Sequence, residues 1–487
     1  MNEHEIALCK KSNAELSEKE INRIKLLVAE MKRAAELMTF LKEEYDLALS
    51  DVEAFVKKHK FSIISAMDVE FAFCVSANEK RMEAMSSLPS NPEKYLELVP
   101  ESFFRYRQFY MNKLYLRNKL RAEICDPRDE KVSKWRKRQI NRCNGALGGT
   151  NLSLIHSLFC FEIARGCSIG CDFCGLGAKK LSEVFRYNDE NAKLFRETLS
   201  VIKNRFGDAG ATGMLYYATE ALDNPDYEKF EDEYYKVFGV IPQITTAAAT
   251  RNVERTREII SKIDSSPATI HRFSVTSIDM AKQIFDAFTP LELLKVELIP
   301  QYREAPGFQG FVSSGHAYIE GNVNNKKTDA GTISAIDGFC VNFCEKSVYL
   351  FTPVRSNEDN PNGIHIFEKV YFQDANDFNE KLQYLIDKYM INEVSNDEII
   401  KLYDYFRIEK DGDSSFLISE YGGEKLNISE KIDGKVDKIL ALISQKSYTR
   451  LEISDIMYSK YSVMPEVTLN VINQLWKNGY IAEKSLG

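Results

Sequence analysis

The feature that most constrains the fold is an alternation of short apolar runs with amphipathic stretches, which begins near residue 150. The apolar runs read LIHSLFCFEIA, GMLYYATE, VIPQITTAA, TIHRFSVTSI and LLKVELIPQ. Between them lie stretches with helical spacing, such as NAKLFRETLSVIKNRF. Strands that alternate with helices form parallel βα units. The sequence therefore predicts an α/β fold whose strands close, or partly close, into a barrel, with its functional site at the C-terminal ends of the strands.

Three cysteines follow the first predicted strand directly, in the stretch CSIGCDFCG, and they are Cys167, Cys171 and Cys174. Structural zinc favours four ligands, usually in paired CxxC units, and no second pair lies at a suitable distance. Three buried structural cysteines seldom lie together on one glycine-rich loop. A [4Fe-4S] cluster normally takes four thiolates, so three cysteines would leave one iron without a protein ligand. We therefore favour an iron–sulfur cluster with one open iron.

Composition excludes several classes of protein. The 487 residues, 44% of them hydrophobic, can form more than one core. The N-terminus lacks the apolar segment of a signal peptide, and no apolar run approaches the roughly 18 residues of a membrane helix, so we expect a cytoplasmic protein without a membrane partner. Ten scattered cysteines make no disulfide framework. A net charge of −8 argues against nucleic acid as the main partner.

Three domains are predicted. Apolar residues at three- and four-residue spacing predict a helical domain over 1–145, whose basic stretch from Lys131 to Cys143 either docks an acidic peptide or is a solvated helix face. Residues 146–380 contain the strand-and-helix alternation and a bridging segment. Residues 400–487 predict a three-stranded meander and three helices, the last ended by Gly479, which is a winged-helix-like arrangement.

The cysteine motif, Cys-x3-Cys-x2-Cys with an aromatic residue before the last cysteine, resembles that of the radical S-adenosylmethionine superfamily. The resemblance implies a partial (βα)6-type barrel, a [4Fe-4S] cluster and S-adenosyl-L-methionine bound to the open iron. Cleavage of that cofactor after one-electron reduction would give a 5′-deoxyadenosyl radical, and the protein would orient the cofactor and exclude quenchers. Phe173 would then pack near the adenine, and Gly175 would let the backbone pass close to the cluster.

The same resemblance assigns further cofactor contacts. The stretch YYATE stands where the family has a Gly-Gly-Glu motif, so Ala218, Thr219 and Glu220 would meet the methionyl amino group, although the two glycines are missing here. In FSVTSID, Ser277 stands where a serine contacts the methionyl carboxylate, and Ser274 is the alternative. Taken one at a time, each could equally be an ordinary polar residue at the end of a strand.

The C-terminal 80 or so residues resemble the PqqD-like leader-recognition element of enzymes that mature ribosomally made peptides. In that element an extended leader peptide adds as a strand to the sheet edge and rests against the last helix. A structural winged helix and a nucleic-acid module are the alternatives. The acidic stretch RIEKDGDSSFLISEYGGE disfavours nucleic acid.

The middle of the chain resembles the PoyD-like radical S-adenosylmethionine peptide epimerases over about residues 150–380. The stretches that carry this resemblance are ARGCSIGCDFCGLGA, YYATEALDNPDYEKF, HRFSVTSID, ELIPQYREAP and GTISAIDGFCVNFCEKSVYLFTPVRS. It implies that L-residues of a precursor peptide are converted to D-residues. It also implies an electron donor such as a flavodoxin or ferredoxin.

Epimerisation requires a hydrogen atom to be returned to the radical from the opposite face, and a cysteine thiol suits that step. Cys340 and Cys344 are the candidates, and they share a face because they lie four residues apart. Cys340, after DGF, is the first choice, although both could be small apolar filler. If neither is the donor, the search moves to Cys160, Cys143 or Cys125. Only these two cysteines follow Cys174, too few for an extension with auxiliary clusters.

Two other functions stay open at this point. The first is a different radical reaction on a peptide, such as splicing or cross-linking. The second is a non-enzymatic scaffold that binds a metal or a partner.

Overall fold

The computed structural model describes residues 126–262, 271–293, 296–302, 310–319, 331–411, 414–421, 426–427, 436–484 and 486. The chain divides into two compact units. The described part of the first unit comes from Met214–Tyr216 and Glu220–Phe311, and that of the second from Ile124–Gly213, Tyr217–Thr219 and Val312–Gly487. Most of the expected N-terminal helical domain, with Cys125, lies outside the described residues, and the three domain boundaries stay predictions.

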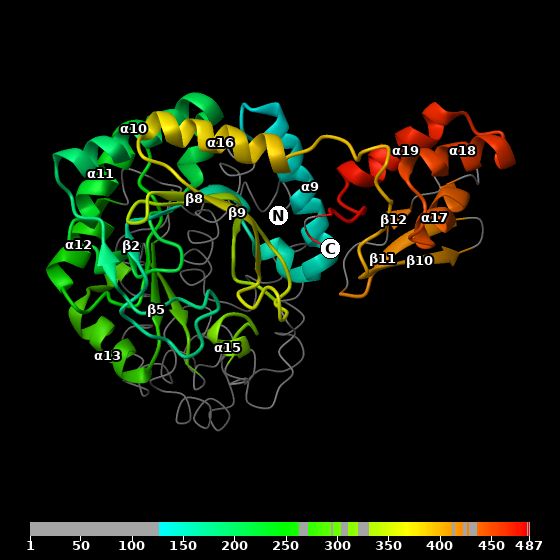
Figure 1. The fold of residues 1–487 in the computed structure, drawn as a ribbon. Coiled ribbons are helices and arrows are strands. Elements are labelled where there is room, and N and C mark those ends of the chain that lie inside the picture. The colour runs from blue at the N-terminus through cyan, green and yellow to red at the C-terminus, as the bar shows by residue number, and fades with distance from the viewer. Residues whose placement is uncertain are drawn as a thin grey trace, which may run out of the picture. The chain divides into compact units, whose positions relative to one another are not determined.

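A four-stranded mixed sheet forms the centre of the second unit, in the order β1-β7-β8-β9 (Figure 1). Its strands are β1 (Ser157–Glu162), β7 (Ile336–Asn342), β8 (Ser347–Pro353) and β9 (Ile364–Tyr371). β1 runs parallel to β7, whereas β8 and β9 are antiparallel to their neighbours. Every residue of β1 and β7 is buried, which explains the near-continuous apolar reading of these strands.

One face of this sheet packs against helices. Figure 1 shows the helices α9 (Glu130–Leu147), α10 (Asp189–Phe206) and α16 (Ala375–Tyr389). Phe159 of β1 contacts Phe339 of β7 and Phe206 of α10, each at 5.3 Å between ring centroids. Because side chains alternate across a strand, Cys160 and Cys340 point to the opposite face.

Helix α9 contains the whole basic stretch, and the structure corrects the interpretation of its arginines. Its lysines are exposed or half-buried, but Arg136, Arg138 and Arg142 are buried. These arginines therefore neither form a solvated face nor stand open to an acidic peptide.

The first unit contains a three-stranded parallel sheet in the order β4-β5-β6. Its strands are β4 (Thr245–Thr246), β5 (His271–Val275) and β6 (Val296–Pro300), and its helices are α11 (Tyr227–Phe238), α12 (Val253–Ser261), α13 (Ile278–Ala287) and α14 (Pro290–Leu293). The predicted alternation of strands with helices is confirmed here. The described strands of the chain form no closed barrel.

One predicted strand is wrong. Residues 213–219, which cover most of GMLYYATE, have no regular structure, and a short 3-10 helix, η4 (Ala221–Asp223), follows. A side chain and not a neighbouring strand binds the backbone here, because the N–H of Ala218 donates to the Glu162 carboxylate.

The C-terminal part of the second unit confirms the predicted meander and three helices. The strands β10 (Phe406–Asp411), β11 (Ser414–Ser419) and β12 (Leu426–Asn427) are antiparallel neighbours. The helices are α17 (Val436–Ser444), α18 (Arg450–Tyr461) and α19 (Pro465–Lys477). Thr449 and Glu452 form a capping box at the start of α18, and Gly479 takes the left-handed conformation after α19. A buried cluster around Trp476 joins these elements.

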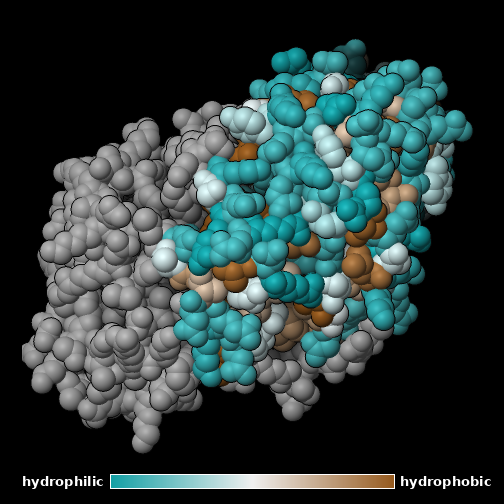
Figure 2. All heavy atoms as spheres, turned by 90° about the vertical axis from the view of Figure 1, so that its left-hand side faces the viewer, coloured by the Kyte–Doolittle hydropathy of each residue, from teal (hydrophilic) through white to brown (hydrophobic). Residues whose placement is uncertain are grey.

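The surface carries few apolar groups on the side shown in Figure 2, where hydrophobic side chains lie scattered among hydrophilic ones. Among the described helices, none is long and apolar enough to cross a membrane.

Candidate functional site

The three-cysteine loop begins at the C-terminal end of β1, as the sequence predicted. A two-residue ladder between β2 (Ala164–Arg165) and β3 (Glu183–Val184) joins the two ends of the loop. The N–H of Cys167 donates to Lys179 O at 2.8 Å, and the N–H of Leu181 donates to Cys167 O at 3.1 Å. Cys167, Cys171 and Cys174 are all half-buried, so the loop holds three thiols near the surface on a closed backbone.

A second segment, residues 314–316, packs on this loop, and sequence analysis did not single it out. His316, which begins the short helix α15 (His316–Ile319), donates from its backbone N–H to Cys174 O at 2.9 Å. Its ring Nδ1 donates to Cys171 O at 3.0 Å. The Ser314 hydroxyl donates to Gly175 O at 2.9 Å. No motif in the sequence marks these residues as partners of the cysteines.

Gly315 makes this close approach possible. Its φ is +59°, and a Cβ there would lie 2.5 Å from Gly177 N and 2.7 Å from Gly175 C. Backbone atoms cannot move aside as the end of a side chain can, so only glycine fits between the two segments.

The three thiols affect one another electrostatically. Burial, and then the negative charges of the neighbouring Cys174, Cys167 and Asp172, together raise the pKa of Cys171 to about 11. Binding a cationic metal centre would compensate for the cost of bringing three thiolates together.

The spacing of the sulfurs bears on which metal centre fits. Thiolates on one tetrahedral zinc, with bonds of about 2.3 Å, would lie about 3.8 Å apart. Within the described ranges, the group of three or more ligand atoms that all lie within 4.8 Å of one another is a different one, so the loop cysteines are spaced more widely. In the part of the chain that the structure describes, the three loop thiols are therefore not gathered at the spacing of a single ion.

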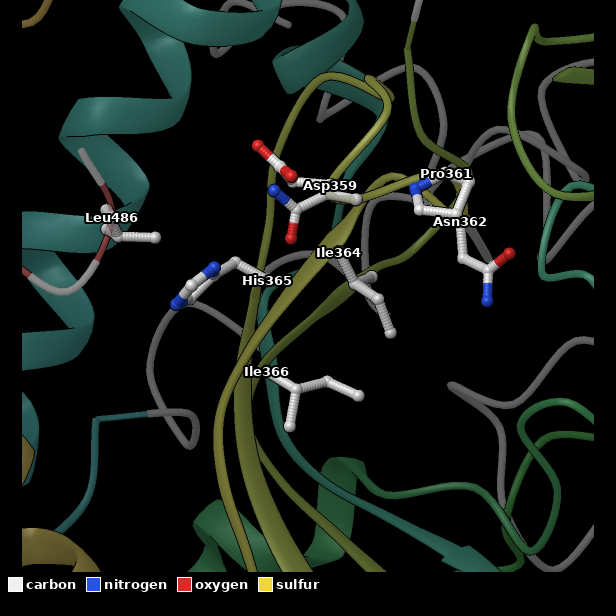
Figure 3. A pocket seen from close by; sticks show the side chains of 8 residues that line it. Asp359, Pro361, Asn362, Ile364, His365, Ile366 and Leu486 are labelled. Carbon is white, nitrogen blue, oxygen red and sulfur yellow. The ribbon is translucent and has the colours of Figure 1, made fainter. Parts of the chain in front are cut away.

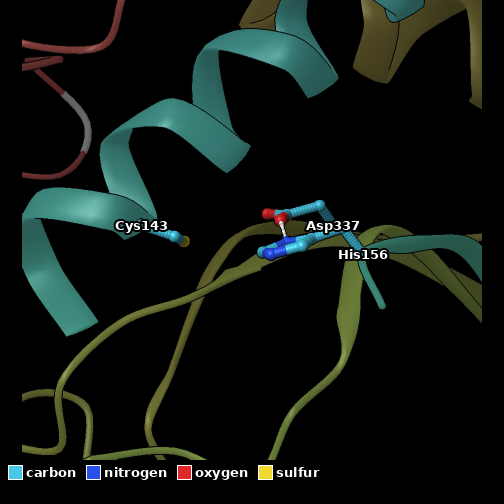
Figure 4. A group of neighbouring side chains, drawn as sticks. All are labelled: Cys143, His156 and Asp337. Atoms are coloured by element: carbon cyan, nitrogen blue, oxygen red, sulfur yellow. Dashed lines mark hydrogen bonds and ion pairs between the residues drawn. The ribbon is translucent and has the colours of Figure 1, made fainter. Parts of the chain in front are cut away.

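That other group consists of Cys143 on α9, His156 before β1 and Asp337 on β7, all buried (Figure 4). Sequence analysis missed it as a group. His156 Nε2 donates to Asn151 Oδ1 at 2.9 Å, and Nδ1 is hydrogen-bonded to the Asp337 carboxylate. Both ring nitrogens are therefore engaged, and neither is open to a metal ion.

A guanidinium already supplies the positive charge at this group. Arg142 Nη2 donates to Thr352 Oγ1 at 2.9 Å and to Pro353 O at 2.5 Å, and it lies 3.4 Å from Cys143 Sγ. Burial raises the pKa of the Cys143 thiol to about 12, although Arg142 opposes the shift. We conclude that the group is a polar network that ties α9 to β7 and β8, and that it is satisfied without a metal.

The predicted cofactor-binding residues fall into two sets. Phe173 and Gly175 lie in the cysteine loop of the second unit, and the structure also places Ala218 and Thr219 in that unit. Glu162, at the end of β1, binds Ala218 N through Oε1 at 3.1 Å and Asn342 Nδ2 through Oε2 at 2.8 Å. Burial raises the pKa of Glu162. The sequence signal for Glu162 was a carboxylate at the end of an apolar run, and it was overlooked.

Glu220, Ser274 and Ser277 belong to the first unit. The Glu220 carboxylate is buried, which raises its pKa, and it accepts hydrogen bonds from Thr246 Oγ1 at 2.6 Å and Ala247 N at 2.9 Å. Ser274 is buried on β5. Ser277 is exposed and caps α13, accepting from Met280 N at 3.1 Å.

The two candidate donor thiols differ in their surroundings. Cys340 is fully buried and pairs in register with Cys160, to which it is hydrogen-bonded, and Tyr349 is its other partner. Cys344 is half-buried in the turn after β7, and burial raises its pKa to about 12. Because β1 and β7 are parallel, with Glu162 opposite Asn342, Cys344 lies at the sheet edge where the cysteine loop begins.

Two hollows lie in the second unit. One, of about 530 Å³, is lined by residues of β9 and of the turn before it, together with Leu486. Figure 3 shows Ile364 and Ile366 on one side of β9 and His365 on the other. The second, of about 360 Å³, lies along β10 and the end of α17, and its lining includes Phe406, Ile408 and Ile443.

Comparison with known proteins finds one similar curated protein. The uncharacterized protein y4wI of Sinorhizobium fredii (strain NBRC 101917 / NGR234) is 36% identical to this chain over 269 residues. The matched part is 54% of this chain and 52% of the relative, so the similarity spans about half of each. No family model matches, and no solved structure matches.

Proposed function

We propose that this chain is a radical S-adenosylmethionine enzyme that converts L- to D-residues in a ribosomally made peptide. The observation that carries the proposal is the closed, half-buried loop with Cys167, Cys171 and Cys174 at the C-terminal end of β1, next to a strand, β7, that bears one candidate thiol and is followed by another. The resemblance of the sequence motifs to those of the PoyD-like peptide epimerases supports the class of reaction.

The residues of this chain have defined roles in the proposal. A [4Fe-4S] cluster held by the three cysteines, together with S-adenosylmethionine, would supply a 5′-deoxyadenosyl radical when bound. Ser277 and the N-terminus of α13 would bind a carboxylate, since a helix N-terminus offers free N–H groups and partial positive charge. Glu220 would pair with an amino group, and Phe173 would cover an adenine ring.

The thiol step is a hydrogen-atom transfer: an S–H bond breaks, a C–H bond forms on the planar carbon radical, and a thiyl radical remains. A donor must hold its proton and must reach the substrate. The raised pKa values keep both Cys340 and Cys344 protonated. Cys340 is fully buried, whereas Cys344 is half-buried at the edge that carries the cysteine loop. We therefore propose Cys344 as the donor and Cys340 as the alternative, which reverses the order chosen from sequence. An external one-electron donor, such as a flavodoxin or ferredoxin, would supply the electron that restores the thiol, and solvent would supply the proton.

The C-terminal part, with its winged-helix-like order of elements, is proposed to bind the leader of the precursor. β10 is an edge strand of its sheet, and the cleft of about 360 Å³ runs beside it over α17. An extended peptide could pair with this edge and place alternate side chains in the cleft. The cleft lies beside α17. The resemblance to the PqqD-like element implies instead that the leader rests against the last helix.

The first test needs no peptide. Reconstituted protein should bind iron and sulfide and, after reduction, should convert S-adenosylmethionine to 5′-deoxyadenosine and methionine. Changing Cys167, Cys171 and Cys174 together to Ala should abolish this cleavage, whereas Cys344→Ala should retain it. Cleavage that survives in the triple variant would refute the proposal.

The second test identifies the reaction. A short peptide encoded beside the gene, co-expressed with the enzyme in deuterated water, should gain about one mass unit per inverted residue, because an exchangeable thiol returns the hydrogen. Splicing or cross-linking would change the product mass in ordinary water, and epimerisation would not. Cys344→Ala should still form 5′-deoxyadenosine but should yield no D-residues.

A further inference from the structure

Helix α9 makes a desolvated contact with the C-terminal part of the second unit. Arg138 Nε donates to Glu483 Oε1 at 2.8 Å, and the two side chains are only 3% and 5% exposed. The Arg138 guanidinium also stacks over the Trp476 ring at 4.2 Å, and its Nη1 donates to Ile391 O at 2.8 Å. Gln139 Nε2 shares the Glu483 oxygen at 2.6 Å. A buried charge pair of this kind is costly to separate, because each charge would lose its partner.

Two glycines allow α9 and the C-terminal part to approach closely at this contact. A Cβ on Gly145 of α9 would lie 2.8 Å from Phe406 Cε1, and one on Gly479 after α19 would lie 2.6 Å from Arg138 O. The Ser419 hydroxyl donates to Gly145 O at 2.5 Å. The backbone after α19 therefore approaches the backbone of α9 more closely than a residue other than glycine at position 479 would allow, whereas Gly145 leaves room for the Phe406 ring.

A third contact lies away from α9. The guanidinium of Arg355, in the segment between β8 and β9, stacks over the Tyr421 ring at 3.7 Å. The C-terminal part is thus held at two places, by α9 and by the segment between β8 and β9. The chain link between them after α16 is, by contrast, mostly exposed over residues 391–396.

We propose that α9 and Arg355 hold the residues from about 394 onward as a fixed body on the four-stranded sheet. The cleft along β10 then keeps a constant distance from the loop of Cys167, Cys171 and Cys174. Given the proposed function, this distance determines how many residues separate the leader segment bound in the cleft from the residue that reacts. The basic stretch on α9 is an internal docking surface and not a site for an external peptide.

A distance measurement tests the fixed geometry. Ketone-bearing residues placed at Glu190 on α10 and Lys460 on α18, both exposed, can carry ketone-reactive spin labels that leave the cysteines untouched. Pulsed electron resonance on the complete chain should give one narrow distance distribution. Inserting the four residues Gly-Ser-Gly-Ser between Asn392 and Glu393 should leave the distance distribution unchanged. A broad distribution that widens or shifts with the insertion would overturn the proposal.

Cutting the link tests which residues hold the contact. With a specific protease site inserted between Asn392 and Glu393, the cut wild-type fragments should elute together in gel filtration. The double variant Arg138→Met with Glu483→Gln removes both charges and retains most of the volume, and its fragments should separate after cutting. Lys134→Ala, on the exposed face of α9, is the matched control and should behave as wild type, because the ion partner of Lys134 among the described residues is Glu130 of the same helix.

Every outcome has a defined meaning. Separation of the cut wild-type fragments, or a double variant that stays joined as firmly as wild type, would show that α9 does not fix this body. Neither experiment requires a cluster, a cofactor or a peptide. Failure of the proposed chemistry would therefore leave both results unchanged, and the two proposals can fail separately.

Discussion

Replacing Gly315 with Ala should release the segment that packs on the cysteine loop. The added Cβ would lie 2.5 Å from Gly177 N, where ordinary contacts begin near 3.4 Å. The two backbones would therefore have to separate by about 1 Å to restore normal contact distances. Such a shift would break hydrogen bonds between the two segments, namely the one that Cys174 O accepts from His316 N at 2.9 Å and the one that Gly175 O accepts from the Ser314 hydroxyl at 2.9 Å.

The destabilisation of the closed loop by Gly315→Ala can be summed from these contacts. A side chain at a positive φ costs about 1–2 kcal/mol, and each lost hydrogen bond costs about 1 kcal/mol net. The sum is about 3 kcal/mol, which makes the locally open state roughly 100-fold more populated.

Amide hydrogen exchange of His316 in metal-free protein measures this opening, and iron per chain after reconstitution measures its effect on the site. The matched control is Gly170→Ala in the same loop, where φ is +68° but a Cβ would have nothing within 4 Å. The control should show only the backbone cost, about 1 kcal/mol. Equal exchange rates and equal iron content in the two variants would refute the steric argument.

Three further changes test other parts of the structure. Cys143→Ser should leave the zinc and iron content of the protein unchanged in elemental analysis, because its network is satisfied without a metal. Glu162→Gln should lower the free energy of unfolding by about 1–3 kcal/mol, seen as a reduced melting temperature. The carboxylate accepts from both Ala218 N and Asn342 Nδ2, and the NH2 of the Gln carboxamide would face one of these donors without an acceptor. Burial raises the pKa of Glu231 to about 7 against an ordinary 4.5. The folded chain thus holds a proton that the unfolded chain releases, so stability should fall as pH rises from about 4.5 to 7, and Glu231→Gln should flatten the melting temperature over that range.

The elements that sequence analysis predicted well are those with strong local signals. The stretch NAKLFRETLSVIKNRF has apolar residues at helical spacing, and α10 forms there, capped by the Asn188 side chain. LIHSLFCFEIA and TIHRFSVTSI contain compact apolar runs, and β1 and β5 form within them. Gly479 ends α19 because only glycine takes its left-handed conformation without strain. Each of these signals lies within a few residues of the structure it specifies.

The elements that sequence analysis missed depend on distant partners. The stretch GMLYYATE has the composition of a strand, but Glu162, 56 residues from Ala218, binds the backbone there instead. The segment at His316 lies 145 residues from Cys171, to which its ring donates. Nothing in either local sequence indicates the other member of the pair. The cysteine spacing marked the loop, but only the fold shows what packs on it.

The basic stretch of α9 shows how a charge pattern can mislead. A run of positive residues usually indicates a solvated face, but here the two residue types separate. The half-exposed or exposed lysines Lys131 and Lys137 pair with Asp387 and Asp126 at the surface, whereas the buried arginines bind partners far along the chain, as Arg138 does with Glu483.

The separation follows from helical geometry and from the chemistry of the two cations. Trp135, Arg138, Gln139 and Arg142 recur at helical spacing and form one buried stripe. Lys134 and Lys137 fall outside this stripe, whereas Lys131 lies in line with it in the first turn and is half-buried. A guanidinium is more weakly hydrated than an ammonium and presents several donors in a fixed plane, so it can be buried where carbonyls, carboxylates and aromatic rings surround it. Arginine and tryptophan on one helical stripe, with Lys134 and Lys137 off it, therefore indicate an internal docking face. Sequence analysis that counted only charge could not distinguish this stripe from a solvated one.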